Sequence, residues 1–366
     1  MTSRERVLAV FNHRQPDRVP AWCGASPEFR ALARERLGLG GDDEALSLYL
    51  GDDFRRVFAK YVGPPERSPS SSFTHPEATS RTPFGIERYG YGYGQPLDHP
   101  LAEARTLDDI ERFAWPDPAW MDVSGVKAEA LVWRGEFAVL GGDWSPFFHD
   151  AIDLLGMEKF MTLLLDGPEI VAAVLDRIVD YYAEVSRRIF EAAAGAIDIF
   201  FIGNDFGTQN GPVVGGAMFR RFFLPRLARL VRLGHEYGLR VMLHCCGGFA
   251  PLIPDFIGIG LDALQSLQPD ARDMAPERLK RLYGGRIVLN GCIDTHHWLI
   301  HGTPALVREK VRVLLQVMKP GGGFIASPSH DYLLPETPVD NVLAVYETVR
   351  EHGAYGNPPT GSGTKD

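Results

Sequence analysis

From residue 136 onward, short apolar runs that end in polar or glycine-containing residues alternate with longer stretches of helical periodicity. The apolar runs predict strands over residues 137–140, 197–202, 240–243, 261–267, 287–289 and 324–326. Helical patterns cover residues 151–165, 168–194, 216–238, 274–283, 304–318 and 338–352. Strands that alternate with helices in this way are expected to be parallel and joined by crossovers. The pattern therefore favours an α/β fold.

An early strand near Val19, and one more strand that the pattern does not place, would give the eight strands of a (βα)8 TIM barrel. A doubly wound sheet is the alternative, but no glycine-rich phosphate-binding motif follows the first strand. The 366 residues suit one barrel domain with an N-terminal extension, expected over residues 1–352. Residues 353–366 are expected to form a flexible tail.

The N-terminal third lacks this alternation. A first helix is expected between Ser3 and Pro16, and residues 26–60 have a helical pattern broken at residues 38–41. Residues 63–100 are rich in Pro, Ser, Gly and Tyr, which predicts an irregular excursion that contains a small hairpin. Such an excursion would serve either as a lid over a site or as a subunit interface.

Composition excludes several partners and compartments. A net charge of −9 argues against nucleic acid or an anionic membrane as the main partner. No apolar stretch is long enough to span a membrane, and the N-terminus lacks a signal-peptide pattern. The four cysteines are too few for a disulfide framework and indicate reduced thiols, so we expect a cytoplasmic protein.

The apolar run at residues 240–243 ends in His244, Cys245, Cys246 and two glycines. Because side chains alternate along a strand, His244 and Cys246 should share one face while Cys245 points the other way. Imidazole nitrogen and thiolate sulfur are good zinc ligands. The alternative is a hydrogen-bonded core histidine beside buried thiols.

Other predicted strand ends also carry polar residues. Asp205 could bind substrate or act as an acid or base, or it could cap the next loop. Asn204 and Gln209 are weaker catalytic candidates, and Asp143 could equally cap a helix. For His296 and His297 the start of a helix at the barrel rim is the favoured interpretation.

Several motifs in order resemble the uroporphyrinogen decarboxylase superfamily over nearly the whole chain. They are RERVL at 4–8, PDRVP at 16–20, GNDFGTQNGP at 203–212, HEYG at 235–238, HCCG at 244–247 and PETPVDNV at 335–342. One branch of that superfamily consists of metal-free decarboxylases, which hold porphyrinogen carboxylates with an arginine-containing motif after the first strand. Here residues 21–27 read AWCGASP without arginine, which weighs against that substrate.

The other branch resembles cobalamin-dependent methyltransferases, which hold zinc with a His-x-Cys pair and a further cysteine near the last strand. The resemblance implies His244 and Cys246 as zinc ligands. Because residues 327–330 read SPSH, His330 would be the third ligand, with Cys292 as a substitute. The resemblance also implies a corrinoid on a separate partner protein, and a homodimer.

The leading hypothesis is a zinc-dependent methyltransferase that moves a methyl group between a small substrate and that corrinoid. The first alternative is a metal-free carboxy-lyase acting on a carboxylated substrate, which would depend on Asp205 or on the acidic pair Asp52 and Asp53. The second alternative is a non-catalytic relative that binds a ligand without turnover.

Overall fold

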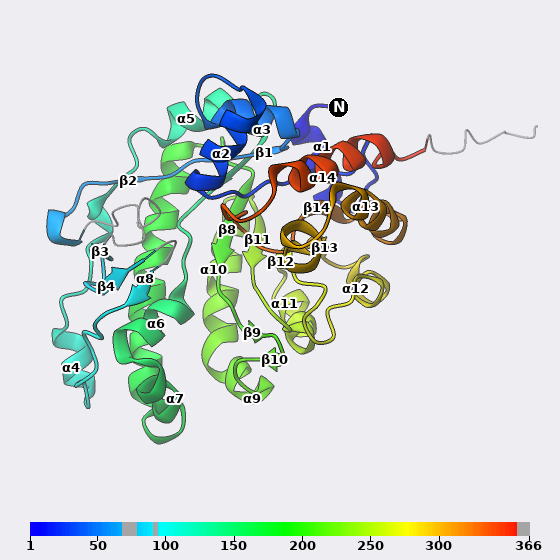
Figure 1. Ribbon diagram of the computed structural model, residues 1–366. Coiled ribbons are helices and arrows are strands. Elements are labelled where there is room, and N and C mark those ends of the chain that lie inside the picture. The colour runs from blue at the N-terminus through cyan, green and yellow to red at the C-terminus, as the bar shows by residue number, and fades with distance from the viewer. Residues whose placement is uncertain (68–78, 91–93, 357–366) are drawn as a thin grey trace, which may run out of the picture.

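A computed structural model describes residues 1–67, 79–90 and 94–356, and its central feature is a curled parallel sheet (Figure 1). Within the described residues the strand order is β1-β7-β8-β11-β12-β13-β14, and every neighbouring pair is parallel. The strands are β1 (Phe54–Arg56), β7 (Ala138–Gly141), β8 (Ile199–Gly203), β11 (Arg240–His244), β12 (Ala263–Leu267), β13 (Val288–Ile293) and β14 (Phe324–Pro328). The predicted α/β fold is confirmed.

The short segment at residues 19–22 joins the two edges of this sheet. Ala21 forms a parallel bridge to Ala326 in β14, and the Ala21 carbonyl accepts a hydrogen bond from the Asp53 amide just before β1. The strand predicted near Val19 is thus present only as isolated bridges rather than as a continuous strand. The strand that the sequence left unplaced is β1, so the helical pattern assigned to residues 26–60 was wrong at its end.

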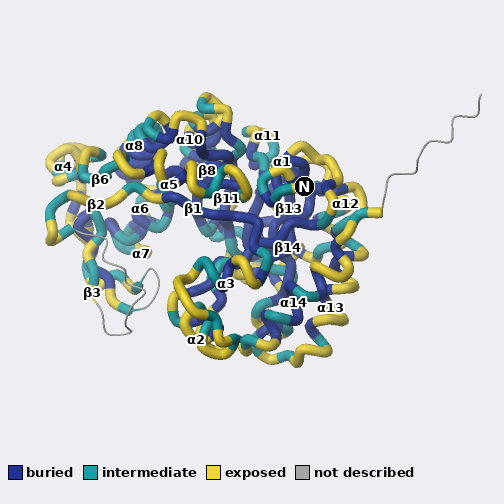
Figure 2. The backbone as a smooth tube through the Cα atoms, turned by 90° about the horizontal axis from the view of Figure 1, so that it is seen from above, coloured by how far each residue is buried: buried dark blue, intermediate teal, exposed yellow. Residues whose placement is uncertain are grey.

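Helices surround the sheet, and their outer faces are exposed while the strands are buried (Figure 2). They are α1 (Ser3–Phe11), α2 (Pro27–Leu37), α3 (Asp43–Leu50), α4 (Leu107–Arg112), α5 (Val126–Trp133), α6 (Phe147–Leu155), α7 (Met157–Asp166), α8 (Pro168–Ala193), α9 (Gly216–Met218), α10 (Leu224–Glu236), α11 (Ile253–Gly258), α12 (Pro276–Tyr283), α13 (Pro304–Met318) and α14 (Val339–His352). Within the described residues no helix is long and apolar enough to cross a membrane.

Two hydrophobic clusters explain why the strands read as continuous apolar runs. Inward-facing side chains such as Phe201 and Met242 fill the barrel interior together with Val7, Val10 and Phe11 of α1. The alternate residues pack outward against the surrounding helices. Both faces of each strand are thus buried, as expected for a parallel sheet.

The excursion predicted at residues 63–100 contains a small antiparallel sheet in its described part, in which β4 (Glu87–Tyr89) lies between β3 (Thr79–Arg81) and β5 (Gln95–Pro96). Just outside the excursion, β2 (Lys60–Tyr61) pairs with β6 (Met121–Asp122). Arg88 ties this excursion to α6, because its guanidinium contacts the carboxylates of Asp150 and Asp153. Residues 68–78 and 91–93 of the excursion, and the predicted tail from 357 onward, lie outside the described residues.

Candidate functional site

Three side chains converge at the carboxyl ends of β8 and β11, and we call Asp205, His244 and Cys246 the metal group. In the parallel register His244 pairs with Gly203, which brings Asp205, two residues beyond it, over the end of the neighbouring strand. His244 Nε2 lies 3.4 Å from Cys246 Sγ and 3.3 Å from Asp205 Oδ1. The shared face predicted for His244 and Cys246 is confirmed.

Cys245 points the other way, as predicted. Its thiol is fully buried in the outer core and accepts a hydrogen bond from the Phe206 amide at 3.4 Å. Burial raises the pKa of Cys245 well above its usual value. The Cys245 thiol is therefore next to the metal group in sequence but is directed into the outer core.

The donor atoms of the metal group fit a zinc ion. Tetrahedral zinc with bonds of about 2.0–2.1 Å to nitrogen or oxygen and about 2.3 Å to sulfur separates its ligand atoms by roughly 3.4–3.6 Å. The distances from His244 Nε2 to the other two donors are close to this range, and all three donor atoms lie within 4.8 Å of one another. Three protein donors would leave a fourth position for substrate.

Two buried residues hold His244 in the orientation that a ligand needs. His244 Nδ1 lies 2.6 Å from Gln265 Oε1, and Gln265 Nε2 donates to Asp331 Oδ1 at 3.1 Å. Since the Gln265 oxygen accepts from Nδ1–H, the Nε2 atom faces Asp205 and Cys246, and a metal ion bound there would replace the proton that Nε2 shares with Asp205. This arrangement has the form of the hydrogen-bonded supports that metal-binding histidines commonly have.

A bulge in β12 supplies a further contact to the thiol. The register between β12 and β13 shifts between Gln265 and Leu267, and Ser266 has a φ of 71°. The Ser266 hydroxyl consequently lies 3.5 Å from Cys246 Sγ and donates to the Ser329 carbonyl. Bulges often redirect a side chain toward a site in this way.

In the metal-free protein the charges around His244 and Asp205 favour an imidazolium–carboxylate pair, so metal binding would have to displace a proton from His244. Burial would lower the pKa of His244, but the negative charges of Cys246 and Asp205 raise it well above its usual value. Burial would raise the pKa of Asp205, yet hydrogen bonds from His149 and His244 hold it far below its usual range. Asp205 is therefore a carboxylate, with its second oxygen 3.5 Å from His149 Nε2.

A cavity of about 310 Å³ opens on the metal group, and we call it the excursion cavity. Asp205 and His244 form part of its wall, together with Trp144 and His149. The excursion contributes Arg88, Gln95 and Pro96 to the same wall. The described part of the excursion thus borders the cavity that Asp205 and His244 line, and its role as lid or subunit interface stays a prediction.

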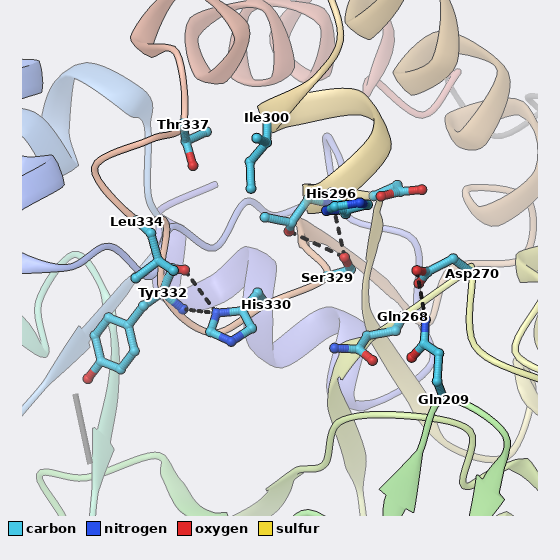
Figure 3. Close-up of a pocket in the computed structure, with 12 residues that line it drawn as sticks. Gln209, Gln268, Asp270, His296, Ile300, Ser329, His330, Tyr332, Leu334 and Thr337 are labelled. Atoms are coloured by element: carbon cyan, nitrogen blue, oxygen red, sulfur yellow. Dashed lines mark hydrogen bonds between the residues drawn. The ribbon is translucent and has the colours of Figure 1, made fainter. Parts of the chain in front are cut away.

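A second cavity of about 340 Å³ lies over the ends of β12 to β14, and we call it the His330 cavity (Figure 3). His330 Nδ1 is hydrogen-bonded within its own loop, to the amide and carbonyl of Tyr332. Among the described residues, His330 is not in the group whose donor atoms could share a metal ion. Asp205 takes the place in that group that the resemblance assigned to His330.

Cys292, the substitute ligand, is also outside the metal group. It is fully buried in the outer core, and burial raises its pKa well above the usual range. Cys292 has a φ of 69° and comes directly after Gly291, which also has a positive φ. The backbone is irregular at this end of β13, and the thiol faces the outer core rather than the barrel mouth. We therefore replace Cys292 and His330 by Asp205 as the third candidate ligand.

The remaining sequence candidates have structural partners. Asn204 is fully buried and bridges to the segment from the end of β7 to the first turn of α6, accepting from the Phe148 amide and donating to the Ser145 carbonyl. Gln209 donates to Asp270 at the edge of the His330 cavity. Asp143 accepts from the Ser145 amide, and burial raises its pKa to about 6.

The acidic pair before β1 lies at the opposite, amino-terminal end of that strand. Asp53 is fully buried and forms ion pairs with Arg6 and Arg18, so its role in the barrel is structural. His297 also fits the structural interpretation, since Asp294 caps its short helix and contacts its ring. His296 lines the His330 cavity.

Sequence reasoning missed Gln265, Ser266, His149 and Asp331. A signal existed for the first two, because they interrupt an otherwise apolar strand, Ala-Leu-Gln-Ser-Leu at 263–267. Polar residues inside such a run must find partners. His149 and Asp331 lie in segments whose pattern carries no comparable signal.

Comparison with known proteins gives related sequences and one shared fold. A family model described as uroporphyrinogen decarboxylase (URO-D) matches residues 96–352. The uroporphyrinogen decarboxylase of Magnetococcus marinus is 25% identical, covering 96% of this chain and 98% of the relative, and that of Xanthomonas euvesicatoria is 26% identical, covering 88% and 90%. A methyltransferase from Methanosarcina mazei has a TM-score of 0.64 at 19% identity, covering 96% of this chain and 99% of its own.

Proposed function

The chain belongs to the uroporphyrinogen decarboxylase family, and on that premise we propose that it is a zinc-dependent methyltransferase. It would move a methyl group between a small substrate and a corrinoid carried on a separate protein. The observation that carries the proposal is the metal group, whose nitrogen, sulfur and oxygen donors are spaced as zinc ligands and open onto a cavity. The shared fold with a methyltransferase is compatible with it.

Zinc bound there would act as a Lewis acid that stabilises a substrate thiolate or polarises a substrate oxygen. Gln265 would keep Nε2 of His244 directed at the ion, and the Ser266 hydroxyl lies 3.5 Å from the Cys246 sulfur. His149 is half-exposed at the cavity wall, where its ring can accept the proton that a bound thiol releases and pass it to solvent. Trp144 and the excursion restrict the access of water to this space.

The test begins with the metal content of the purified protein and of two variants. His244→Ala and Cys246→Ala should each lower zinc content at least about tenfold, because each removes one of three protein donors. Cys245→Ala is the matched control, since it removes a neighbouring thiol that faces the outer core. Full zinc retention in both ligand variants would rule out this site.

The second arm measures the reaction with methylcobalamin as the corrinoid probe and small thiols as acceptors. Loss of the cobalt-bound methyl group should require zinc and should stop in the His244→Ala variant. The names of the curated relatives favour a carboxy-lyase as the alternative. Release of CO2 from a carboxylated substrate that chelators do not inhibit would support that alternative, and ligand binding without turnover would indicate a binding protein.

A further inference from the structure

Arg56 is the last residue of β1, and its side chain points into the mouth of the barrel. Phe54, two residues earlier, belongs to the interior cluster, whereas Arg55 points outward and pairs with Glu44. The Arg56 guanidinium carbon lies 5.2 Å from the ring centres of both Trp144 and Phe201. These contacts fix it above the apolar floor of the barrel.

The guanidinium of Arg56 forms no ion pair with any described carboxylate, although its positive charge acts on the buried Asp143, whose pKa burial raises to about 6. Its Nε is buried without a hydrogen-bond partner, and Arg56 forms no hydrogen bond or ion pair with any other described residue. Other buried arginines of the chain do have carboxylate partners, such as Arg6 with Asp53 and Arg88 with Asp150. Because arginine stays charged in proteins, a partly buried guanidinium without an anion is costly unless a ligand supplies one.

The stacking leaves the hydrogen-bonding edge of Arg56 available. A guanidinium that packs its flat face on an aromatic ring keeps its N–H groups in its own plane, directed past the ring. Trp144 also contacts His244, with ring centres 5.2 Å apart, and it lines the excursion cavity. Trp144 therefore contacts both the Arg56 guanidinium and His244 of the metal group.

We propose that Arg56 binds a carboxylate of the substrate, and so defines the substrate class as small carboxylates with a thiol or oxygen at the reacting end. The inference rests on the proposed function, in which the reacting end lies at the metal group. A planar carboxylate matches the planar fork of a guanidinium through two parallel hydrogen bonds. Arg56 would thus be a specificity-determining residue that contacts the non-reacting end of the substrate.

The test compares thiols that differ in their charged end. Zinc-loaded wild-type protein is titrated with mercaptoacetate, 3-mercaptopropionate and the uncharged 2-mercaptoethanol by isothermal calorimetry. Wild type should prefer at least one carboxylate over 2-mercaptoethanol by about 10- to 100-fold, the usual effect of a charged bidentate pair. Arg56→Gln should abolish this preference while affinity for 2-mercaptoethanol and zinc content stay unchanged.

Arg56→Lys should retain part of the preference, because it keeps the charge but not the fork. Arg221→Gln is the control, since Arg221 also stacks on an aromatic ring, Phe222, but is exposed outside the mouth. Thermal unfolding checks that each variant is folded. If Arg56→Gln does not fold, the test is carried by the carboxylate preference of Arg56→Lys. An unchanged carboxylate preference in a folded Arg56 variant would overturn the inference.

A metal-free arm separates this inference from the proposed function. Saturation-transfer NMR with propionate and with 1-propanol reports binding without zinc. If the protein never binds zinc but propionate binding depends on Arg56, the methyltransferase proposal fails and the carboxylate site stands. If zinc binds normally and no carboxylate depends on Arg56, the carboxylate site fails and the methyltransferase proposal stands.

Discussion

At the scale of single residues, the metal group depends on Gln265 as much as on the three donors. Its side chain is fully buried, and its oxygen and nitrogen are both committed, to His244 and to Asp331 respectively. The amide oxygen of Gln265 accepts from Nδ1 of His244 and so fixes which ring nitrogen carries that proton. A carboxylate in the same place would add a negative charge, and a hydroxyl would be too short to reach the ring. Zinc binding should therefore respond to Gln265 even though it is not a ligand.

Gln265→Leu should weaken zinc binding by about 10- to 100-fold, because the His244 ring loses its supporting acceptor. Competition with a chromophoric chelator measures this affinity. Asn290→Leu is the matched control: Asn290 is a fully buried amide paired in register with Gln265 on β13, but it contacts Ser327 rather than His244. Equal zinc affinities for the Gln265 and Asn290 variants would contradict the orienting role.

The sequence could predict the site residues that lie together on one short stretch of chain, namely His244 and Cys246. Strand alternation placed His244 with Cys246 and sent Cys245 to the outer core, because the strand is regular up to residue 244. The third donor could not be derived, since it depends on the register between β8 and β11. His330 failed as a ligand because its loop holds the ring to Tyr332.

At the scale of elements, β1 is the strand that the sequence pattern missed. It has three residues, Phe-Arg-Arg, and two adjacent arginines do not read as a barrel strand. The structure accommodates both, since Arg55 pairs outward with Glu44 and Arg56 stacks inward on aromatic rings. Longer apolar strands were predictable because both of their faces are buried.

Asp52 and Asp53 fix the start of β1 and should respond to mutation with opposite signs. Burial raises the pKa of Asp52 to about 7. Between about pH 4 and pH 7 the folded protein thus keeps a proton that the unfolded chain loses, so the free energy of unfolding falls as pH rises through this window. Asp53 instead makes two ion pairs.

Asp52→Asn should remove this pH dependence. Relative to wild type, the variant should be more stable by on the order of a few kcal/mol at pH 8 and little changed near pH 4. Asp53→Asn should be destabilised by about 3–5 kcal/mol at pH 8, because it leaves Arg18 without a carboxylate partner and Arg6 with Asp17 alone. Urea unfolding at both pH values measures these differences, and equal stability of wild type and Asp52→Asn at pH 8 would contradict the raised pKa.

At the scale of the whole molecule, the N-terminal segment both closes the barrel and supports the metal group. After the bridge at Ala21, the chain passes Gly24, whose carbonyl accepts a hydrogen bond from the Leu333 amide. The loop after β14 carries Asp331, which holds Gln265. Contacts between the first and last tenths of the chain therefore orient a ligand on β11, which no local sequence pattern could reveal.

Gly24→Ala tests this long-range support. A Cβ at Gly24 would lie 1.7 Å from the Asp331 carbonyl oxygen, so the Asp331 loop must move away. We expect a loss of about 1–3 kcal/mol or more in the free energy of unfolding, as for other overpacked sites. We also expect about tenfold weaker zinc binding, because displacement of Asp331 releases Gln265 and, through it, the His244 ring.

Gly40→Ala is the appropriate control, since a Cβ there meets nothing within 4 Å and Gly40 does not have a positive φ. Urea unfolding measures the stability of each variant and identifies conditions in which both are folded. Zinc affinity is then compared under those conditions, so that weaker binding is not caused by unfolding. A Gly24→Ala protein that is less stable but binds zinc like wild type would show that the loop tolerates the displacement. In that case Asp331 would not transmit the position of the N-terminal segment to His244, and the metal group would be independent of barrel closure.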